Sequence, residues 1–175
     1  MPKRAAQINQ ELAYSLSNNL VRLLKEFSKD FEGQILAKLH RRGHPLIRRS
    51  HSAVFSNLGL GAVRVTELAE RAKVTQQAMG KMSKELERIG YIARNVDKMD
   101  KRAREIRLTS AGINLVEESL RACEDVQAQY AAKIGEQKLH DLERALRSAV
   151  AKLELNYLPE SWVETTLPQG KPLVF

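Results

Sequence analysis

The sequence predicts a mainly α-helical protein of the α+β class with one short β-hairpin, and three observations lead to this fold class. Hydrophobic residues make up 43% of the 175 residues and aromatic residues only 5%, which favours helices over a β-sandwich. Apolar residues recur at helical steps of three and four through most of the chain. The stretch from Val65 to Gly112 holds two capped helical patterns followed by a charged hairpin, the order of a winged helix-turn-helix.

The net charge of the chain predicts a polyanionic partner. The formal net charge is +8, which attracts nucleic acid or an acidic membrane surface. No apolar run approaches the roughly 18 residues that span a bilayer, and the N-terminus lacks the apolar core of a signal peptide. We therefore expect a cytoplasmic protein with no membrane partner. The single cysteine, Cys123, can form neither an intrachain disulfide nor a thiolate zinc site.

Residues 1-45 are expected to form a long helix that mediates dimerisation. From Ile8 to Leu39 the apolar side chains follow one helical stripe of roughly thirty residues, with a bend expected near Gly33. Pro45 cannot continue a helix, and the pattern ends there. Because a helix this long in a small protein packs beyond its own domain, it is the first candidate for a contact between subunits.

The segment after this helix is basic. From Lys38 to Arg49 it carries five cations and no acid, and either a solvated loop or a secondary phosphate-binding patch would account for that pattern. His40, His44 and His51 cluster here without a local cysteine or carboxylate. We therefore expect histidines on the loop and helix surface, and no metal site.

Residues 46-109 are expected to form the DNA-binding core, a winged helix-turn-helix. Ser50 is expected to cap a short helix, Thr66 the next one, and Thr75 the recognition helix at about residues 75-89. The recognition helix is expected to bury its apolar side, which consists of Ala78, Met79, Met82, Leu86 and Ile89.

The opposite side of the recognition helix carries side chains suited to DNA. Gln76 and Gln77 each offer a donor and an acceptor to adenine edges, and Lys81 and Lys84 can reach guanine or phosphate. Thr75 can both cap the helix and turn its backbone amides toward a phosphate. The alternative interpretation is an ordinary solvated helix face.

The hairpin at about residues 91-108, the wing, is expected to supply a second DNA contact. Between Arg94 and Arg107 the sequence has six cations and three acids, and a basic turn is narrow enough to enter the minor groove. We expect Arg102 to enter that groove, with Asp100 holding it through a charge-assisted bond. The other predicted contacts of the wing are Lys98, Lys101 and Arg104.

Residues 110-155 are expected to form two C-terminal helices that also mediate dimerisation. Thr109 is expected to cap the first of them and Gly135 to end it, and both helices carry apolar residues at the spacing of helix-helix seams. Cys123 is in phase with such a seam, so core packing is expected, with redox sensing as the alternative. Residues 156-175 contain three prolines and are expected to form an extended tail.

Several short motifs in this stretch resemble the MarR family of bacterial regulators. They are Glu67-Leu68-Ala69, Val74-Thr75, Leu86-Glu87-Arg88-Ile89-Gly90-Tyr91-Ile92, Asp100-Lys101-Arg102-Ala103, Leu108-Thr109 with Gly112, and upstream Gly43-His44-Pro45-Leu46. The resemblance covers about residues 8 to 155. It implies triangular homodimers, made by the N- and C-terminal helices, that bind pseudo-palindromic operators near promoters, usually as repressors. The chain departs from the family at Gly80-Lys81, where many members have a Thr-Arg pair, and Gly80 is expected to permit close approach to DNA or to a neighbouring helix.

The resemblance also implies a small-molecule effector, since many members release DNA when an aromatic or phenolic ligand or an oxidant acts between the dimerisation and DNA-binding regions. Four side chains are candidates for lining such a pocket, although an ordinary core explains them equally well: Phe31, Ile35, His51 and Phe55. The predicted partners are therefore double-stranded DNA, a second copy of the chain, and this effector.

Two other classes of function are weighed against this one, and the first remains an alternative. An architectural DNA-binding protein with little sequence preference would share the charge and the fold. An enzyme is not expected, because the sequence shows no nucleophile-base pair, phosphate loop or metal cluster, and no cofactor is predicted.

Overall fold

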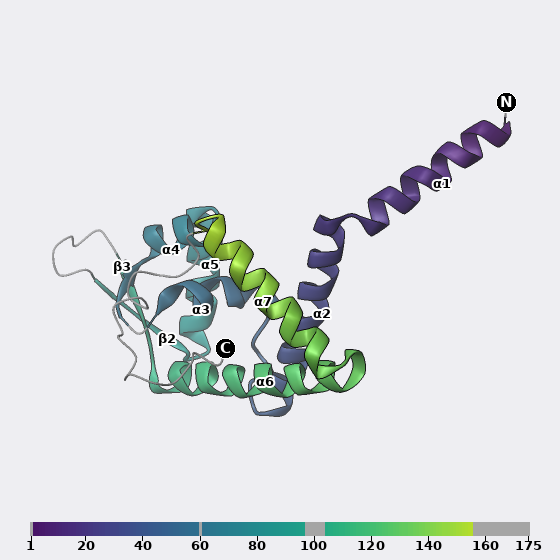
Figure 1. Cartoon of the computed structure of the whole chain (residues 1–175). Coiled ribbons are helices and arrows are strands. Elements are labelled where there is room, and N and C mark those ends of the chain that lie inside the picture. Colours follow the sequence, from purple (N-terminus) through teal and green to yellow (C-terminus); the bar gives the residue numbers. More distant parts are fainter. Residues whose placement is uncertain (1, 60, 97–103, 156–175) are drawn as a thin grey trace.

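Seven α-helices, one 3-10 turn and three short strands make up the described part of this computed structural model, which comprises residues 2-59, 61-96 and 104-155 (Figure 1). In chain order the elements are α1 (Pro2–Asn18), α2 (Leu20–Arg41), η1 (Arg49–His51), α3 (Ser52–Leu58), β1 (Val63–Arg64), α4 (Val65–Arg71), α5 (Gln76–Arg88), β2 (Ile92–Val96), β3 (Arg104–Leu108), α6 (Ser110–Ile134) and α7 (Glu136–Lys152). The predicted α+β class and winged helix-turn-helix are confirmed. The 156-175 tail lies outside the described residues.

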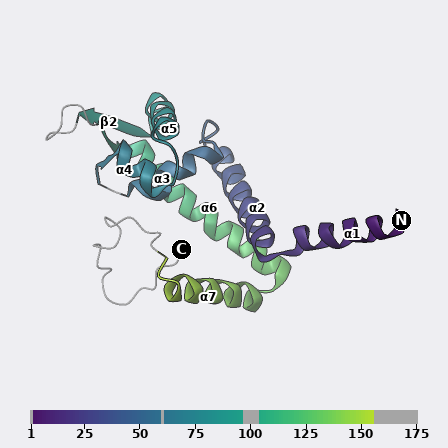
Figure 2. The same ribbon diagram turned by 90° about the horizontal axis from the view of Figure 1, so that it is seen from above.

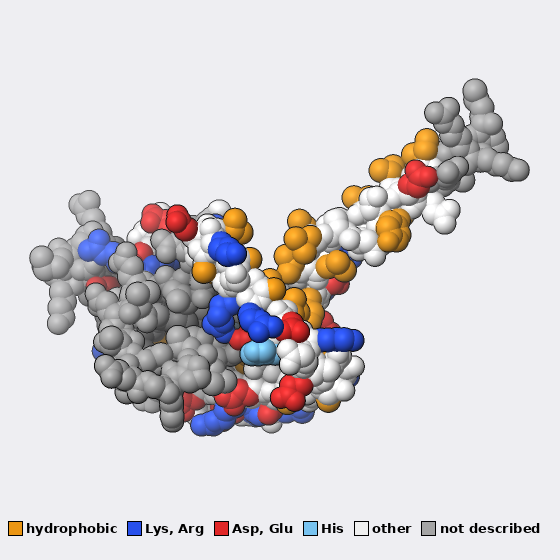
Figure 3. Space-filling model, viewed as in Figure 1, with side chains coloured by type: hydrophobic (Ala, Val, Ile, Leu, Met, Phe, Trp, Pro, Cys, Tyr) orange, Lys and Arg blue, Asp and Glu red, His pale blue; other side chains and the backbone are white. Residues whose placement is uncertain are grey.

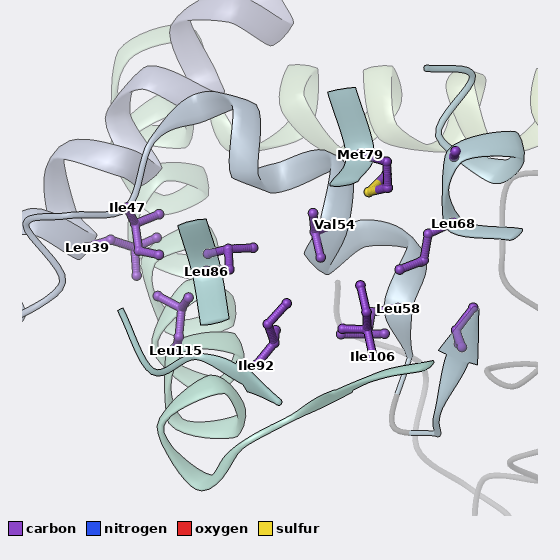
Figure 4. Close-up of a cluster of buried hydrophobic side chains, with 12 residues drawn as sticks. Leu39, Ile47, Val54, Leu58, Leu68, Met79, Leu86, Ile92, Ile106 and Leu115 are labelled. Atoms are coloured by element: carbon purple, nitrogen blue, oxygen red, sulfur yellow. The ribbon is translucent and has the colours of Figure 1, made fainter. Parts of the chain in front are cut away.

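The strands form one small antiparallel sheet in the order β1-β3-β2. Val63 of β1 faces Ile106 of β3, and β2 pairs with β3 from Ile92 opposite Leu108 to Val96 opposite Arg104. The sheet covers helices α3, α4 and α5, and a single apolar core lies between them (Figure 4). This core fixes α5 against the wing. Its larger members are Leu39, Ile47, Val54, Leu58, Leu68, Met79, Leu86, Ile92, Ile106 and Leu115.

Two predicted helix caps are confirmed. The Thr75 side chain accepts a hydrogen bond from the Ala78 backbone N–H at 3.1 Å, at the start of α5. The Thr109 side chain accepts one from the Gly112 N–H at 3.1 Å, at the start of α6. Each cap satisfies a backbone donor that the first turn of a helix leaves without a partner. Gly135 ends α6, as predicted.

The other two caps were predicted wrongly. Ser50 lies inside η1, and α3 begins only at Ser52. Thr66 lies inside the first turn of α4, whose N-cap is Arg64, because β1 runs directly into this helix. Ser50 stands two positions before the first residue of α3, and Thr66 stands one position after the first residue of α4. The apolar pattern alone does not determine a helix start to within one or two residues.

The predicted single N-terminal helix is two helices, and the bend expected near Gly33 is absent. The break lies at Asn19, whose side chain accepts from the Arg22 N–H at 2.9 Å and donates to the Ser15 and Leu16 carbonyls at 3.0 Å each. Asn19 thus satisfies backbone groups on both sides of the break, which stabilises the interruption.

Gly33 instead makes room for a side chain within a continuous α2. A Cβ atom at this position would lie 3.2 Å from Nη2 of Arg49. That nitrogen donates to the Lys29 carbonyl at 2.8 Å. The glycine therefore lets the Arg49 guanidinium lie directly against the helix.

Helix α2 packs beside α6 (Figure 2), and a cluster of three aromatic rings joins the two helices. The centroid of Tyr130 on α6 lies 5.4 Å from that of Phe27 and 5.2 Å from that of Phe31, both in edge-on geometry, which is a favourable arrangement for aromatic pairs. Tyr130 also donates a hydrogen bond to Asp30. Burial, together with this bond, raises the pKa of Tyr130 to about 12.

Helix α1 stands away from the rest of the chain, as Figures 1 and 2 show. Apolar side chains gather along it and along the start of α2 (Figure 3). These exposed side chains, which we call the N-terminal apolar stripe, are Ile8, Leu12, Leu16, Leu20, Leu23, Leu24 and Phe27. Leu142 and Leu146 of α7 are also exposed, as is Leu153 directly after the helix. Both surfaces leave large apolar groups in water within a single chain.

Candidate nucleic-acid interface

The recognition helix α5 is held by its buried side. Met79, Ser83 and Leu86 are fully buried, and the Ser83 hydroxyl donates to the Met79 carbonyl at 2.8 Å, so its polar group is satisfied. Met82 and Ile89 are half-buried, as their helical spacing predicts. Ala78 was predicted to be buried and is exposed, because Met79 and Ser83 define the side that faces the core.

The opposite side of α5 presents the predicted DNA-binding residues to solvent. Gln76, Gln77, Lys81 and Lys84 are all exposed. In the part of the chain that the structure describes, none of these four side chains has a hydrogen-bond or ion-pair partner. Thr75 adds its capping hydroxyl at the start of the helix. The geometry thus gathers these five residues on and around one accessible helix face.

The wing begins and ends as predicted, but its tip falls among residues that are not described. Lys98, Asp100, Lys101 and Arg102 lie outside the described residues, so their roles remain predictions. Arg104 opens β3, opposite Val96 in the strand register.

The base of the wing is fastened to the recognition helix by an ion pair. Arg94 of β2 lies 3.6 Å from Glu87 of α5, and its side chain is largely buried. Also at the base of the wing, where the two strands begin and end, the Thr109 hydroxyl donates to the Gly90 carbonyl at 2.6 Å, and the Thr109 backbone N–H donates to the Tyr91 carbonyl at 3.1 Å. These bonds fix the direction of the wing relative to α5.

Gly112 permits this fastening. A Cβ atom there would lie 2.1 Å from the Tyr91 carbonyl oxygen, a distance at which backbone atoms must shift. The first turn of α6 therefore approaches the chain at the base of the wing more closely than any side chain would allow. The resemblance includes this glycine, but its reason is visible only in the fold.

Two of the three clustered histidines are buried, contrary to the surface positions predicted for them. His44 is 6% exposed and its Nδ1 is hydrogen bonded to the Tyr91 hydroxyl at 2.8 Å. His51 is completely buried, and its Nδ1 accepts from the Arg48 backbone N–H at 3.2 Å. His40 remains exposed, with its ring bonded to the Ile47 carbonyl. Long-range partners explain the burial that local sequence did not indicate.

His51 connects the turn η1 to the recognition helix. Because its Nδ1 is an acceptor, the ring proton is on Nε2, which faces Oε2 of Glu85 on α5 at 3.4 Å. Arg48 Nη1 lies 3.0 Å from the other oxygen of the same carboxylate. The hydrogen bond from His51, aided by the charge of Arg48, lowers the pKa of Glu85 although partial burial opposes it.

The substitution Glu85→Gln is expected to flatten the acid side of the stability profile. A lowered folded-state pKa means that the carboxylate stabilises the fold above its unfolded pKa, and that this contribution is lost as the pH falls through the folded value. The difference in unfolding free energy between wild type and variant should therefore shrink between about pH 5 and pH 3. Urea titrations across this range measure it. The exposed Glu124→Gln serves as control, and a constant difference would contradict the expectation.

Four of the five cations from Lys38 to Arg49 face acids, which argues against a phosphate-binding patch in this segment. Arg42 lies 2.7 Å from Asp125 and 3.4 Å from Glu118, both on α6. Lys38 lies 3.5 Å from Asp125. Arg48 and Arg49 face Glu85 and Glu32 respectively. Among the described residues, none is an acidic partner for Arg41, the remaining cation of this segment.

A cavity of about 340 Å³ lies between α2, η1, α3 and α6. Its walls are mainly aliphatic, and Arg48 and Arg49 line it as well. Of the four predicted ligand contacts, Ile35 and Phe55 line this cavity. Phe31 is instead part of the aromatic cluster with Tyr130, and His51 faces Glu85. The sequence did not single out the arginines for this role, and Glu32, which faces Arg49, lines the cavity beside them.

Cys123 does not have the surroundings of a reactive thiolate. It is half-buried on α6, and burial, with Glu124 and Glu143 nearby, raises the pKa of its thiol. A raised pKa lowers the fraction of thiolate, which is the species that oxidants attack. These surroundings favour the packing role over the redox alternative.

The described ranges contain neither a metal-ligand cluster nor a membrane-spanning helix. Within residues 2-59, 61-96 and 104-155, no group of three or more histidine, cysteine or acidic side chains could hold a metal ion. No described helix is both long and apolar enough to cross a bilayer.

Part of this chain matches a family model, and solved structures share its fold. The MarR family model matches residues 59–103, which run from the end of α3 through α5 into the wing. A cysteine-to-serine mutant of MarR from E. coli is similar over 75% of this chain and 96% of its own, with a TM-score of 0.64 and 19% identity. YusO from Bacillus subtilis is similar over 87% and 99%, with a TM-score of 0.55 and 22% identity.

One of the similar structures contains DNA. The same mutant of E. coli MarR, complexed with operator DNA, is similar over 78% of this chain and 97% of its own, with a TM-score of 0.61 and 18% identity. At these identities the structural likeness establishes the fold. None of the curated proteins matches the chain significantly in sequence.

Proposed function

We propose that this chain is a member of the MarR family, and that it is a homodimeric transcription regulator that binds specific DNA sequences, acts as a repressor, and releases DNA when a small aromatic or phenolic ligand binds. The observation that carries the proposal is the face of α5. Gln76, Gln77, Lys81 and Lys84 project from it into solvent without partners in the described chain, while the other side is anchored in the core.

The rest of the chain is proposed to pair two such helices. In this view residues 46-109 bind DNA, and the helices in residues 1-45 and 110-155 join the subunits. The N-terminal apolar stripe and the exposed leucines of α7 are the surfaces that a second copy would cover. A two-fold dimer would present its recognition helices to a pseudo-palindromic operator, in major grooves about 10 base pairs apart or a multiple of that spacing.

We assign the side chains of α5 and of the wing different contacts with DNA. The lysines of α5 and the basic tip predicted for the wing would neutralise phosphates, so binding should fall steeply with salt concentration. Arg102 would enter the minor groove, held there by Asp100. The glutamines would read adenine edges in the major groove. The similar E. coli MarR structure includes operator DNA, which agrees with this arrangement.

The ligand is proposed to bind in the cavity between α2, η1, α3 and α6. Its aliphatic walls suit an aromatic ring, and Arg48 and Arg49 at its edge suit a phenolate or carboxylate. The redox route through Cys123 is not proposed, because the pKa of its thiol is raised.

Selection of bound sequences from a random pool of duplexes, with and without candidate phenolic ligands, tests the proposal. We expect enrichment of a palindromic motif, and loss of that enrichment when an effective ligand is present. Equal affinity across random duplexes would instead support an architectural protein. That outcome would overturn sequence-specific regulation.

The substitution Gln77→Ala is expected to relax preference at particular base pairs of the selected motif. An amide pairing with adenine is worth about 1–3 kcal/mol of discrimination, so the preference at those positions should fall by that amount. Lys84→Ala, on the same exposed face, should weaken all sequences equally and lower the salt dependence. Titrations against single-base variants of the motif measure both. A uniform loss for Gln77→Ala would count against base reading.

A further inference from the structure

Gly80 is half-buried and lies where the exposed face of α5 meets the buried side of the helix. In a helix, positions three and four apart lie side by side on the surface. Gln76 and Gln77 are therefore its neighbours toward the start of the helix, and the exposed Lys84 and the buried Ser83 are its neighbours toward the end. A residue without a side chain among three long ones leaves a notch in the face that is proposed to read DNA.

The fold itself does not require this glycine. A Cβ atom at Gly80 would meet no atom within 4 Å, and its φ is not among the positive values recorded for other glycines. Gly33 and Gly112 differ, because a Cβ at those positions would press on Arg49 or on the Tyr91 carbonyl. A glycine inside a helix is less stable than an alanine. The chain therefore carries a destabilising residue at Gly80 for which its own packing shows no reason.

The surface at the bottom of the notch is apolar. Gly80 lies well inside α5 (Gln76–Arg88), where its N–H and carbonyl are used in the hydrogen bonds of the helix. The notch therefore presents Cα hydrogens and no free donor, so it is unsuited to a phosphate, which is bound through donors. In the major groove, the group that is both apolar and protruding is the C5-methyl of thymine.

We propose that the notch at Gly80 receives the methyl group of a thymine in each half of the operator. This inference rests on the proposed function, and it adds a residue that determines specificity through its missing side chain. A thymine beside adenines read by Gln76 or Gln77 would make the preferred motif rich in A·T pairs at its contacted positions. The absence of a Cβ lets the helix lie close enough for the contact.

The variant Gly80→Ala should fold better and bind worse. The added methyl meets open space in the free protein, so the unfolding equilibrium constant should fall about two- to fivefold in urea titrations. On the wild-type motif the same methyl would collide with the thymine methyl, and affinity should fall about tenfold. Opposite signs for stability and binding separate this effect from any damage to the fold.

Uracil, which is thymine without the methyl group, identifies the contact. Each thymine of the selected motif is replaced by uracil in turn, symmetrically in both halves. At one position the wild type should lose about fourfold in affinity, the value of one buried methyl group. At that same position Gly80→Ala should regain most of its lost affinity, because the removed methyl makes room for the Cβ. Lys84→Ala is the matched control: it binds weakly but should respond to uracil as the wild type does.

Each outcome decides the proposal. Equal operator affinity of Gly80→Ala and wild type, or a loss of affinity that no uracil substitution relieves, would contradict the proposed contact between the notch and a thymine methyl group. Sequence-specific binding would remain supported in either case. A wild-type protein that selects no motif would overturn the proposed function, and the notch with it. Relief at one symmetric position, together with a stabilised variant, would support both.

Discussion

Gly112→Ala is expected to lower the free energy of unfolding by about 3 kcal/mol or more, at the upper end of the cost of overpacking. The added Cβ would lie 2.1 Å from the Tyr91 carbonyl oxygen. That oxygen already accepts the Thr109 N–H, so neither the start of α6 nor the base of the wing can move without losing a hydrogen bond. Urea denaturation followed by circular dichroism measures the change.

Gly80→Ala provides the matched control for this prediction, because it adds the same methyl group to another helix where space is open. The two variants should shift the urea midpoint in opposite directions. A Gly112→Ala protein within about 1 kcal/mol of wild type would mean that the base of the wing repacks at little cost, contrary to the usual stiffness of protein interiors.

The substitution Leu16→Asp is expected to weaken the proposed dimer at least about 100-fold. Leu16 is 68% exposed in the single chain, so a charge there should leave the monomer folded. In a two-fold interface the same change occurs on both copies, and two carboxylates would lose their water. Operator affinity should fall with the dimer, since one recognition helix alone makes half of the contacts.

Sedimentation velocity over a range of protein concentrations measures this loss, with circular dichroism to confirm the helical content. Gln10→Asp is the control, because it places the same charge on the opposite side of α1, at another exposed position. If Leu16→Asp associates as tightly as wild type, the N-terminal apolar stripe is not the subunit contact, and the leucines of α7 become the candidate.

The features that were predicted from sequence depend on neighbours close along the chain. Thr75 and Thr109 cap helices because each bonds to an amide three residues later, and a local pattern contains that information. The same holds for the apolar spacing that buries Met79 and Leu86, and for the paired strands of the wing.

The features that were missed depend on partners far along the chain. The buried ring of His51 faces Glu85 on another helix, with Nε2 3.4 Å from the carboxylate, and Arg42 is paired because Asp125 lies across from it on α6. The break at Asn19 involves a local signal, but the apolar stripe continues through it, so periodicity alone could not locate it. For Gly112, the sequence showed the residue without showing the carbonyl that it accommodates.

Arg48 belongs to two parts of the molecule at once, because it lines the cavity and also pairs with Glu85 of the recognition helix. An anion bound in the cavity that pairs with Arg48 must compete with the Glu85 carboxylate for this guanidinium. Thermodynamic linkage then runs in both directions: if the anion changes the affinity of α5 for DNA by some factor, DNA changes the affinity for the anion by the same factor. The affinity of an effector for the free protein would therefore differ from its affinity for the operator complex by that same factor.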